Sequence, residues 1–360
     1  MPGLACLLLP TCNNSATMNR PFAPSRPPRV RRMGRRTAAA LCRFGTVLRH
    51  AVTVALLGGL GLAWACPAPD LVEVVPGVLV RHGLWPALHP EGHDHQATSV
   101  VLWAGDLASV VDPGPTALEG RALRRALACR GLRRIDRVFN SHAHAEQVLA
   151  NGALRAPVAA TASAQASMRR RCPDCLAALR QDLGARALRG TRTVLPTQVL
   201  QAGDTLSAGG RTWQVLELPS AHTESDLALW SAAEGVLIAG GLLDGHGLVL
   251  AQGSVVGWLD ALDRLQALQP QWLIGQYLVR DAAQVPTAFA AQREALCRLV
   301  RWSWQGLDAG WSEAEALNRL PVQGTPNAQR QQRFNLLRAW REMEALWLTQ
   351  APMPAACQPP

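Results

Sequence analysis

The sequence predicts an α+β fold in which two β-sheets pack face to face between outer helices, with a helical extension at the C-terminus. Three observations support this prediction. Short β-branched runs come in pairs near the start of the folded part, apolar runs further along alternate with helical patterns, and only helical patterns remain after about residue 283. Hairpins mixed with strand–helix units are typical of two packed sheets with helices outside.

The expected elements follow one another along most of the chain. Strands are expected at residues 71–75, 77–81, 99–103, 107–111, 135–139, 211–218, 227–230, 235–239 and 271–274. Helices are expected at 118–129, from about 145, within 161–183, at 258–268, 288–304, 312–320 and 328–348. We therefore expect a folded domain over residues 66–283, a helical extension over 284–350 and a disordered tail over 351–360.

The first 65 residues have the features of a secretory signal peptide. Arginines precede an apolar run at 51–65, AVTVALLGGLGLAWA, which ends in a small-x-small pattern. The run is too short and too rich in glycine for a typical membrane span. We expect cleavage before Cys66 and export to a periplasm-like space, with an uncleaved anchor or a lipoprotein as alternatives. Met18 and Met33 are alternative starts of the chain.

The net charge of +10 does not indicate a nucleic-acid partner, because it is unevenly distributed. Nine of the 36 arginines and none of the 26 acids lie in residues 1–65, which leaves 27 arginines against 26 acids. The part beyond the signal is nearly neutral. We therefore expect no nucleic-acid binding, and contact with a membrane only through the N-terminal segment.

Export would place the cysteines in an oxidising compartment, where disulfides form. Cys172 and Cys175 have the C-x-x-C spacing of redox sites, but they lie inside a helical pattern and not just after a strand. The sequence therefore favours a local structural disulfide between them, with a redox role as the alternative. No second pair is spaced for a zinc knuckle.

Two histidines one residue apart are the most informative feature of the chain. His142 and His144 follow directly after the apolar run at 135–139. A strand that ends there can direct both imidazoles toward one cation, because imidazole nitrogen is a common zinc ligand.

The segment around these histidines resembles a known family. Residues 141–154, SHAHAEQVLANGAL, are similar to the H-x-H-x-D-H signature of the metallo-β-lactamase-fold hydrolases. Further similar motifs are Asp112-Pro113-Gly114, Pro219-Ser220-Ala221-His222-Thr223 with Asp226, Ala239-Gly240-Gly241-Leu242, and Ile274-Gly275-Gln276. The resemblance spans residues 71–278 and implies an αββα sandwich. Residues 168–196 and 335–344 are more similar to one exported branch, the quinoprotein relay system zinc metallohydrolases.

The resemblance implies one metal position that is kept and one that is altered. The histidines of the family's first metal position are all present, as His142, His144 and His222. At the second position the family's Asp, His, Asp and His are replaced by Glu146, Gln147, Gly241 and Gln276. Because glutamine is a poor zinc ligand and glycine has no side chain, we expect a single zinc ion.

Three imidazoles and one water make up a catalytic zinc site, which lowers the pKa of the water from 15.7 to about 7. The resemblance thus implies an exported hydrolase in which zinc-bound hydroxide attacks an ester, thioester or lactam-like small molecule, with Glu146 as general base. The alternative is a catalytically inactive protein of this fold that binds a ligand, or an accessory protein of a periplasmic quinoprotein system.

Three more histidines are candidates for a replacement ligand, namely His93, His95 and His246. Solvated loop side chains are the simpler interpretation for His93 and His95, and a turn beside Gly245 and Gly247 explains His246 equally well.

Overall fold

The computed structural model describes residues 70–84, 97–250 and 252–358. The expected signal peptide, its cleavage site before Cys66, and the pair His93 and His95 lie outside the described residues. Within the described part, no helix is both long enough and apolar enough to cross a membrane.

The first sheet has seven strands that follow their order in the sequence. Its strands are β1 (Leu71–Val75), β2 (Val78–Arg81), β3 (Ser99–Ala104), β4 (Leu107–Val111), β5 (Arg134–Phe139), β6 (Val158–Thr161) and β7 (Gln198–Leu200). The first four pair as antiparallel hairpins, and β4 to β7 run parallel. The paired β-branched runs of the sequence therefore form the hairpins that were expected from them.

The second sheet has six strands in the order β13-β12-β11-β10-β9-β8. Its strands are β8 (Thr205–Ala208), β9 (Arg211–Pro219), β10 (Ser225–Ser231), β11 (Val236–Asp244), β12 (Trp272–Gln276) and β13 (Leu278–Asp281). All neighbours are antiparallel except β11 and β12, which are joined through a helix and run parallel.

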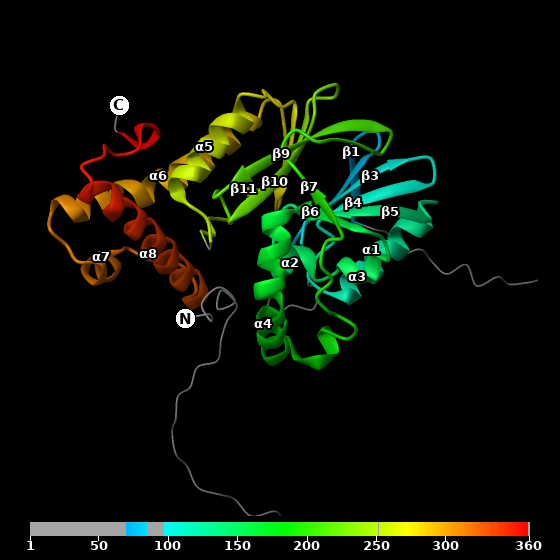
Figure 1. Ribbon diagram of the computed structural model, residues 1–360, viewed down its shortest axis with the longest axis horizontal. Helices are drawn as coiled ribbons and strands as arrows, with labels where there is room; N and C mark the ends of the chain where they lie inside the picture. Colours follow the sequence, from blue (N-terminus) through cyan, green and yellow to red (C-terminus); the bar gives the residue numbers. More distant parts are fainter. Residues whose placement is uncertain (1–69, 85–96, 251, 359–360) are drawn as a thin grey trace, which may run out of the picture. The chain divides into compact units, whose positions relative to one another are not determined.

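Helices cover the outer face of each sheet (Figure 1). The first sheet is covered by α1 (Ala117–Cys129) and α3 (Asn151–Leu154), and α2 (Ala145–Val148) packs with α4 (Ala162–Ala187) beside it. The second sheet is covered by α5 (Val255–Gln266) and α6 (Val285–Asp308), and α8 (Pro326–Leu348) packs on α6, with the short helix α7 (Glu313–Arg319) between α6 and α8.

The alternation of side chains along the strands explains this layering. In β10, Leu227 and Leu229 join the core between the sheets, whereas Ala228 and Trp230 face the helices of the second sheet. Successive side chains of a strand point to opposite faces, so a strand buried on both faces must be apolar throughout. The structure is the αββα sandwich that the sequence predicts.

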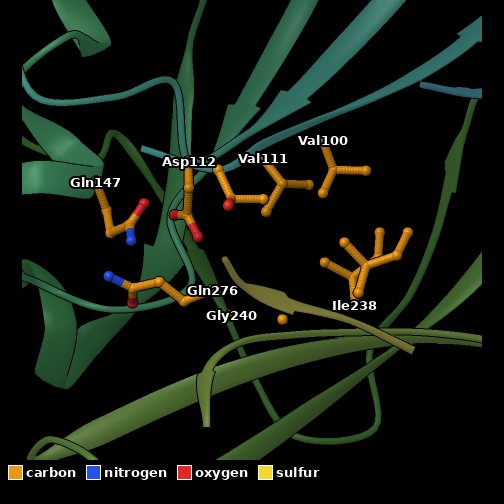
Figure 2. A pocket seen from close by; sticks show the side chains of 10 residues that line it. Val100, Val111, Asp112, Gln147, Ile238, Gly240 and Gln276 are labelled. Carbon is orange, nitrogen blue, oxygen red and sulfur yellow. The ribbon is translucent and has the colours of Figure 1, made fainter. Parts of the chain in front are cut away.

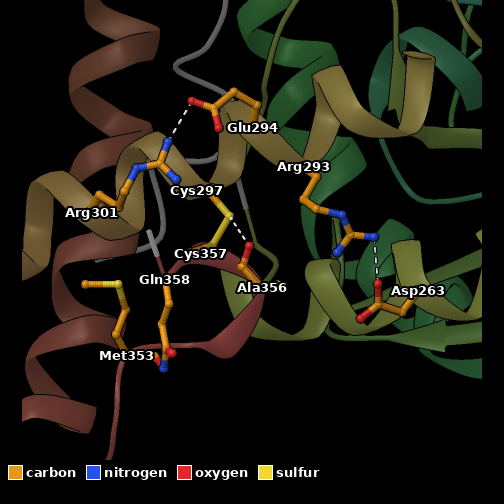
Figure 3. The surroundings of a disulfide bond; sticks show 9 residues. All are labelled: Asp263, Arg293, Glu294, Cys297, Arg301, Met353, Ala356, Cys357 and Gln358. Atoms are coloured by element: carbon orange, nitrogen blue, oxygen red, sulfur yellow. Dashed lines mark hydrogen bonds and ion pairs between the residues drawn. A yellow bond between two sulfur atoms is a disulfide. The ribbon is translucent and has the colours of Figure 1, made fainter. Parts of the chain in front are cut away.

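Within the C-terminal extension, a disulfide links Cys297 of α6 to Cys357 (Figure 3). Cys357 lies in a short 3-10 helix, Ala355–Cys357, and is fully buried. The disordered tail expected at 351–360 is therefore ordered through residue 358. The sequence did not reveal this because the contact joins cysteines 60 positions apart.

The disulfide expected between Cys172 and Cys175 is not formed. Cys172 is a buried free thiol, and Cys175 is disulfide-bonded, but not to Cys172. Both lie on α4, where Cys172 points into the core beside Met168 and Leu176. Burial raises the pKa of the Cys172 thiol to about 12, so the thiolate needed for a redox site does not form near neutral pH.

Candidate metal centre

The three histidines of the predicted metal position meet at one end of the sandwich. His142 and His144 follow β5 of the first sheet, and His222 lies between β9 and β10 of the second. The backbone N–H of Leu227 donates to the carbonyl of Ser141 at 2.7 Å, which ties the two chain segments together. The strand ends therefore bring the imidazoles together from both sheets.

The rings are arranged around a common point. Ring centroids lie 4.7 to 4.8 Å apart and the ring planes are inclined at 82° or 83° to one another. Nδ1 of His144 and Nε2 of His222 are 3.2 Å apart. Two nitrogens bound tetrahedrally to one zinc ion at about 2.0–2.1 Å would be roughly 3.3 Å apart, so this pair has the spacing of zinc ligands.

The third ring supplies a nitrogen without a partner. His142 is fully buried and its Nε2 makes no hydrogen bond. One ligand nitrogen from each of the three rings lies within 4.8 Å of the others. A buried polar atom without a partner is costly, and a cation held by the three lone pairs would satisfy it. The donor set therefore fits a metal ion.

Burial keeps two of these rings in the form that binds metal. The pKa of His142 is well below 6.5, mainly because burial disfavours the charged ring and secondarily because the other two histidines are near. Burial, followed by the nearby His144, also lowers the pKa of His222 well below 6.5. The backbone of Val249 partly opposes this second shift, although its contact with His222 lies outside normal hydrogen-bond geometry. Both rings are thus neutral near pH 7.

A carboxylate and a hydroxyl orient His142. The Ser141 hydroxyl donates to Oδ2 of Asp112 at 2.5 Å, and the Ser141 N–H donates to Oδ1 at 2.8 Å. Oγ of Ser141 is also 2.8 Å from Nδ1 of His142. Because the hydroxyl proton is given to Asp112, Nδ1 of His142 donates to Oγ, and the lone pair stays on Nε2.

Asp112, at the end of β4, is fully buried. Burial raises its pKa to about 7, while the two hydrogen bonds from Ser141 lower it and nearby Glu146 raises it slightly. In the sequence, its Asp-Pro-Gly motif indicates only a similarity to the family. The structure gives the residue a role in orienting a metal ligand.

Glu146 lies beside the trio and outside it. Its Oε1 is 3.7 Å from Nδ1 of His144, and its side chain is 26% exposed. The three histidines form a cluster that does not include Glu146. The carboxylate can therefore exchange protons with water next to the site, as a general base must.

The second metal position offers no strong ligand. A Cβ at Gly241 would lie 2.6 Å from Cδ2 of His222 and 3.0 Å from Cε1 of His142, so the backbone itself fills this place. Gln147 and Gln276 are buried and direct their amides toward one another in a small pocket beside Asp112 (Figure 2). Oε1 of Gln147 has no hydrogen-bond partner.

His246 does not join the centre. It is exposed, and its ring packs edge-on against Tyr277 with 5.5 Å between ring centroids. Among the described residues, the histidine trio is the group of His, Cys, Asp or Glu side chains that is suited to hold a metal.

Two neighbours of the trio were not foreseen from the sequence. Oε1 of Gln252 is 3.2 Å from Nε2 of His144. The ring of Trp258 packs against His222 with 5.0 Å between ring centroids, and its Nε1–H donates to the carbonyl of Leu242. Neither residue belongs to a motif, and Trp258 was visible only as an apolar position of a helix.

Comparison with known proteins agrees with this architecture. The sequence model of the metallo-beta-lactamase superfamily matches residues 92–276, slightly more than half of the chain. No curated protein is significantly similar to the chain.

Two solved structures illustrate the similarity in fold. A beta-lactamase domain protein from Burkholderia ambifaria has a TM-score of 0.57 at 20% sequence identity, over 79% of this chain and 89% of that one. The inverting sec-alkylsulfatase Pisa1 from Pseudomonas sp. has a TM-score of 0.58 at 15% identity, over 79% of this chain and 52% of that one. This chain thus spans about half the length of the sulfatase. On the superfamily match and the fold together, the chain belongs to the metallo-β-lactamase superfamily.

Proposed function

We propose that this protein is an exported hydrolase that holds one zinc ion between His142, His144 and His222. The observation that supports it most strongly is the unpartnered Nε2 of buried His142, which shares a centre with Nδ1 of His144 and Nε2 of His222. Three imidazoles whose nitrogens converge, two of them fully buried and neutral, are the donor set of a catalytic zinc site.

When bound, a zinc ion at three histidines acts as a Lewis acid and lowers the pKa of a water from 15.7 to about 7. The chain's own residues then supply orientation and proton transfer. Ser141 and Asp112 hold His142 in the required tautomer. Glu146 takes the proton of the attacking water and returns it to the leaving group.

A single ion is proposed because the second position cannot hold one in the same way. Gly241 is packed against two of the histidine rings, and the amides of Gln147 and Gln276 are poor zinc ligands. With no second cation to stabilise a leaving group, we propose substrates whose leaving group departs easily, namely esters, thioesters and lactam-like small molecules.

Export is proposed from the signal-like N-terminus. The disulfide between Cys297 and Cys357 supports it, because structural disulfides are rare in reducing compartments. A periplasmic location is therefore part of the proposal.

A second candidate function is a binding or accessory protein of a periplasmic quinoprotein system. The pocket between Gln147 and Gln276 favours it, since buried amides at a former ligand position can bind a molecule without turning it over. This candidate and the hydrolase share the zinc site and differ in turnover.

Metal content tests the first step of the proposal. The full chain, purified without chelator, should contain about one zinc ion, whereas His142→Ala and His222→Ala variants should contain almost none. His246→Ala is the matched control, because this exposed histidine lies outside the cluster. Equal zinc in the parent and the two site variants would refute the proposed metal site.

A further inference from the structure

The connection between β11 and α5 lies against two of the three metal-site histidines. Gln252 places its Oε1 3.2 Å from Nε2 of His144. Gly253 lies against the backbone of His222, because a Cβ at Gly253 would be 2.8 Å from the carbonyl carbon of His222. Gln252 therefore faces the ring nitrogen of His144 that is turned away from His222.

The same connection is packed tightly against the segment that carries His222. The N–H of Ser254 donates to the carbonyl of Ala221 at 3.0 Å. A Cβ at Gly253 would lie 1.7 Å from that carbonyl oxygen, so only glycine allows this approach. A shift of this connection would consequently change the positions of both His144 and His222.

Helix α8 of the C-terminal extension holds this connection in place. Asn335, which is 4% exposed, accepts from the N–H of Leu250 at 2.9 Å and donates to the carbonyl of Leu248 at 2.7 Å. Arg338 donates to the carbonyl of Gly253 at 3.0 Å.

Glu342, one turn further along α8, binds the start of α5. Its carboxylate accepts from the N–H groups of Val255 at 2.7 Å and Val256 at 3.1 Å, and from the Ser254 hydroxyl at 2.5 Å. These are the unsatisfied first-turn donors of a helix, where a negative charge is favourable. Asn335, Arg338 and Glu342 are spaced i, i+3 and i+7, so one face of α8 makes all these contacts.

We propose that α8 is a positioning element of the metal site and that Gln252 is the positioning residue through which it acts on His144. Oε1 of Gln252 accepts from Nε2–H of His144, which fixes the tautomer with its lone pair on Nδ1, the nitrogen that faces His222. The proposal rests on the proposed zinc site. It assigns a role in metal binding to an extension that lies outside the segment matched by the superfamily, residues 92–276.

The test compares Gln252→Leu, which removes the acceptor, with Gln252→Glu, which keeps one. In the metal-free protein, ¹⁵N NMR of the histidine rings reports the tautomer of His144. The parent and Gln252→Glu should show the Nε2–H form, and Gln252→Leu should lose it. Zinc affinity, measured by competition with a chromophoric chelator, should fall roughly 10- to 100-fold for Gln252→Leu and recover in Gln252→Glu.

The role of α8 is tested with Glu342→Ala against Glu344→Ala, a change on the same helix that leaves the Glu342 contacts intact. Only the first should weaken zinc binding and change the tautomer of His144. Should Glu342→Ala fail to fold, the Gln252→Leu and Gln252→Glu variants still test the proposal, because Gln252 is half-exposed and its replacement disturbs the core little. Parent-like affinity and tautomer in Gln252→Leu would overturn it. A parent without zinc would refute the proposed function, and the metal-free NMR comparison would then decide the tautomer separately.

Discussion

Gly241 lies against the ring of His222 so closely that a Cβ at this position would be 2.6 Å from Cδ2 and 2.7 Å from Nε2 of the ring. Real Cβ atoms do not approach other heavy atoms at such distances, and the ring is 2% exposed and has no space to withdraw. The glycine that removes a ligand from the second metal position is thus also required by the geometry of the first. The missing side chain at the second metal position and the position of His222 at the first are therefore coupled through packing.

This coupling predicts that the second site cannot be restored by returning its carboxylate. Gly241→Asp should displace His222 and lower zinc affinity roughly 10- to 100-fold instead of adding a second ion, and Gly241→Ala should do nearly the same. Zinc stoichiometry and competition titration measure both effects. Gly105→Ala is the control, because a Cβ there would meet no atom within 4 Å; its positive φ of 60° adds backbone strain that Gly241→Ala does not carry, so a larger loss of zinc affinity in Gly241→Ala reports packing against His222. Two zinc ions in Gly241→Asp would show that the site can rearrange.

Glu146 is expected to act in turnover and not in metal binding. Glu146→Gln keeps the size of the side chain but removes its basicity, so hydrolysis of a chromogenic ester, thioester or lactam should fall by about 10²- to 10⁴-fold. Zinc content should stay at the parental level, because Glu146 is outside the histidine cluster. Equal loss of zinc and activity would instead make Glu146 a ligand, and unchanged activity would remove it from the mechanism.

Asp112 is expected to make the metal-free protein less stable as the pH rises. Its pKa is 3.8 in an unfolded chain and about 7 in the fold because of burial. Between pH 3.8 and about 7, Asp112 is protonated more often in the folded state than in the unfolded chain. The free energy of unfolding therefore falls as the pH rises through this range, by roughly 4 kcal/mol at most. Urea unfolding of the parent and of Asp112→Asn, at pH 4 to 8 with chelator, measures the difference.

The difference in unfolding free energy between the parent and Asp112→Asn should change in one direction only as the pH rises. His142 and His222 have lowered pKa values and so work oppositely, costing stability as pH falls below 6.5, but they are present in both proteins. The parent should therefore lose stability relative to Asp112→Asn as pH rises from 4 to 7. A difference independent of pH would contradict the assignment.

The sequence predicts His142 and His144 because they follow a strand whose apolar pattern is local, and His222 only because its surrounding motif resembles that of the family. Gln252 could not be found in this way, since its contact with His144 joins positions 108 residues apart. The short strands β6, β7, β8 and β13 were missed for a related reason. They have three or four residues each, too few to show a period before their partners are known.

The cysteines also show that spacing in the sequence does not determine a contact in the fold. The C-x-x-C spacing brought Cys172 and Cys175 close in sequence, but on a helix the neighbouring core decides where each side chain points, and Cys172 is 1% exposed among apolar residues. Spacing alone describes a possible bond, and packing selects the bond that forms.

The disulfide between Cys297 and Cys357 should contribute strongly to the stability of the extension. It closes a segment of 60 residues, and the loss of unfolded-state entropy for a loop of this size corresponds to about 4 kcal/mol. Cys357→Ser should therefore lower the free energy of unfolding by an amount of this order in a chemical denaturation experiment. The double variant Cys297→Ser with Cys357→Ser is the control, because it removes the same bond without leaving a free thiol. A parental denaturation midpoint in both variants would mean that packing of α6 against α8, and not the covalent link, holds the extension together.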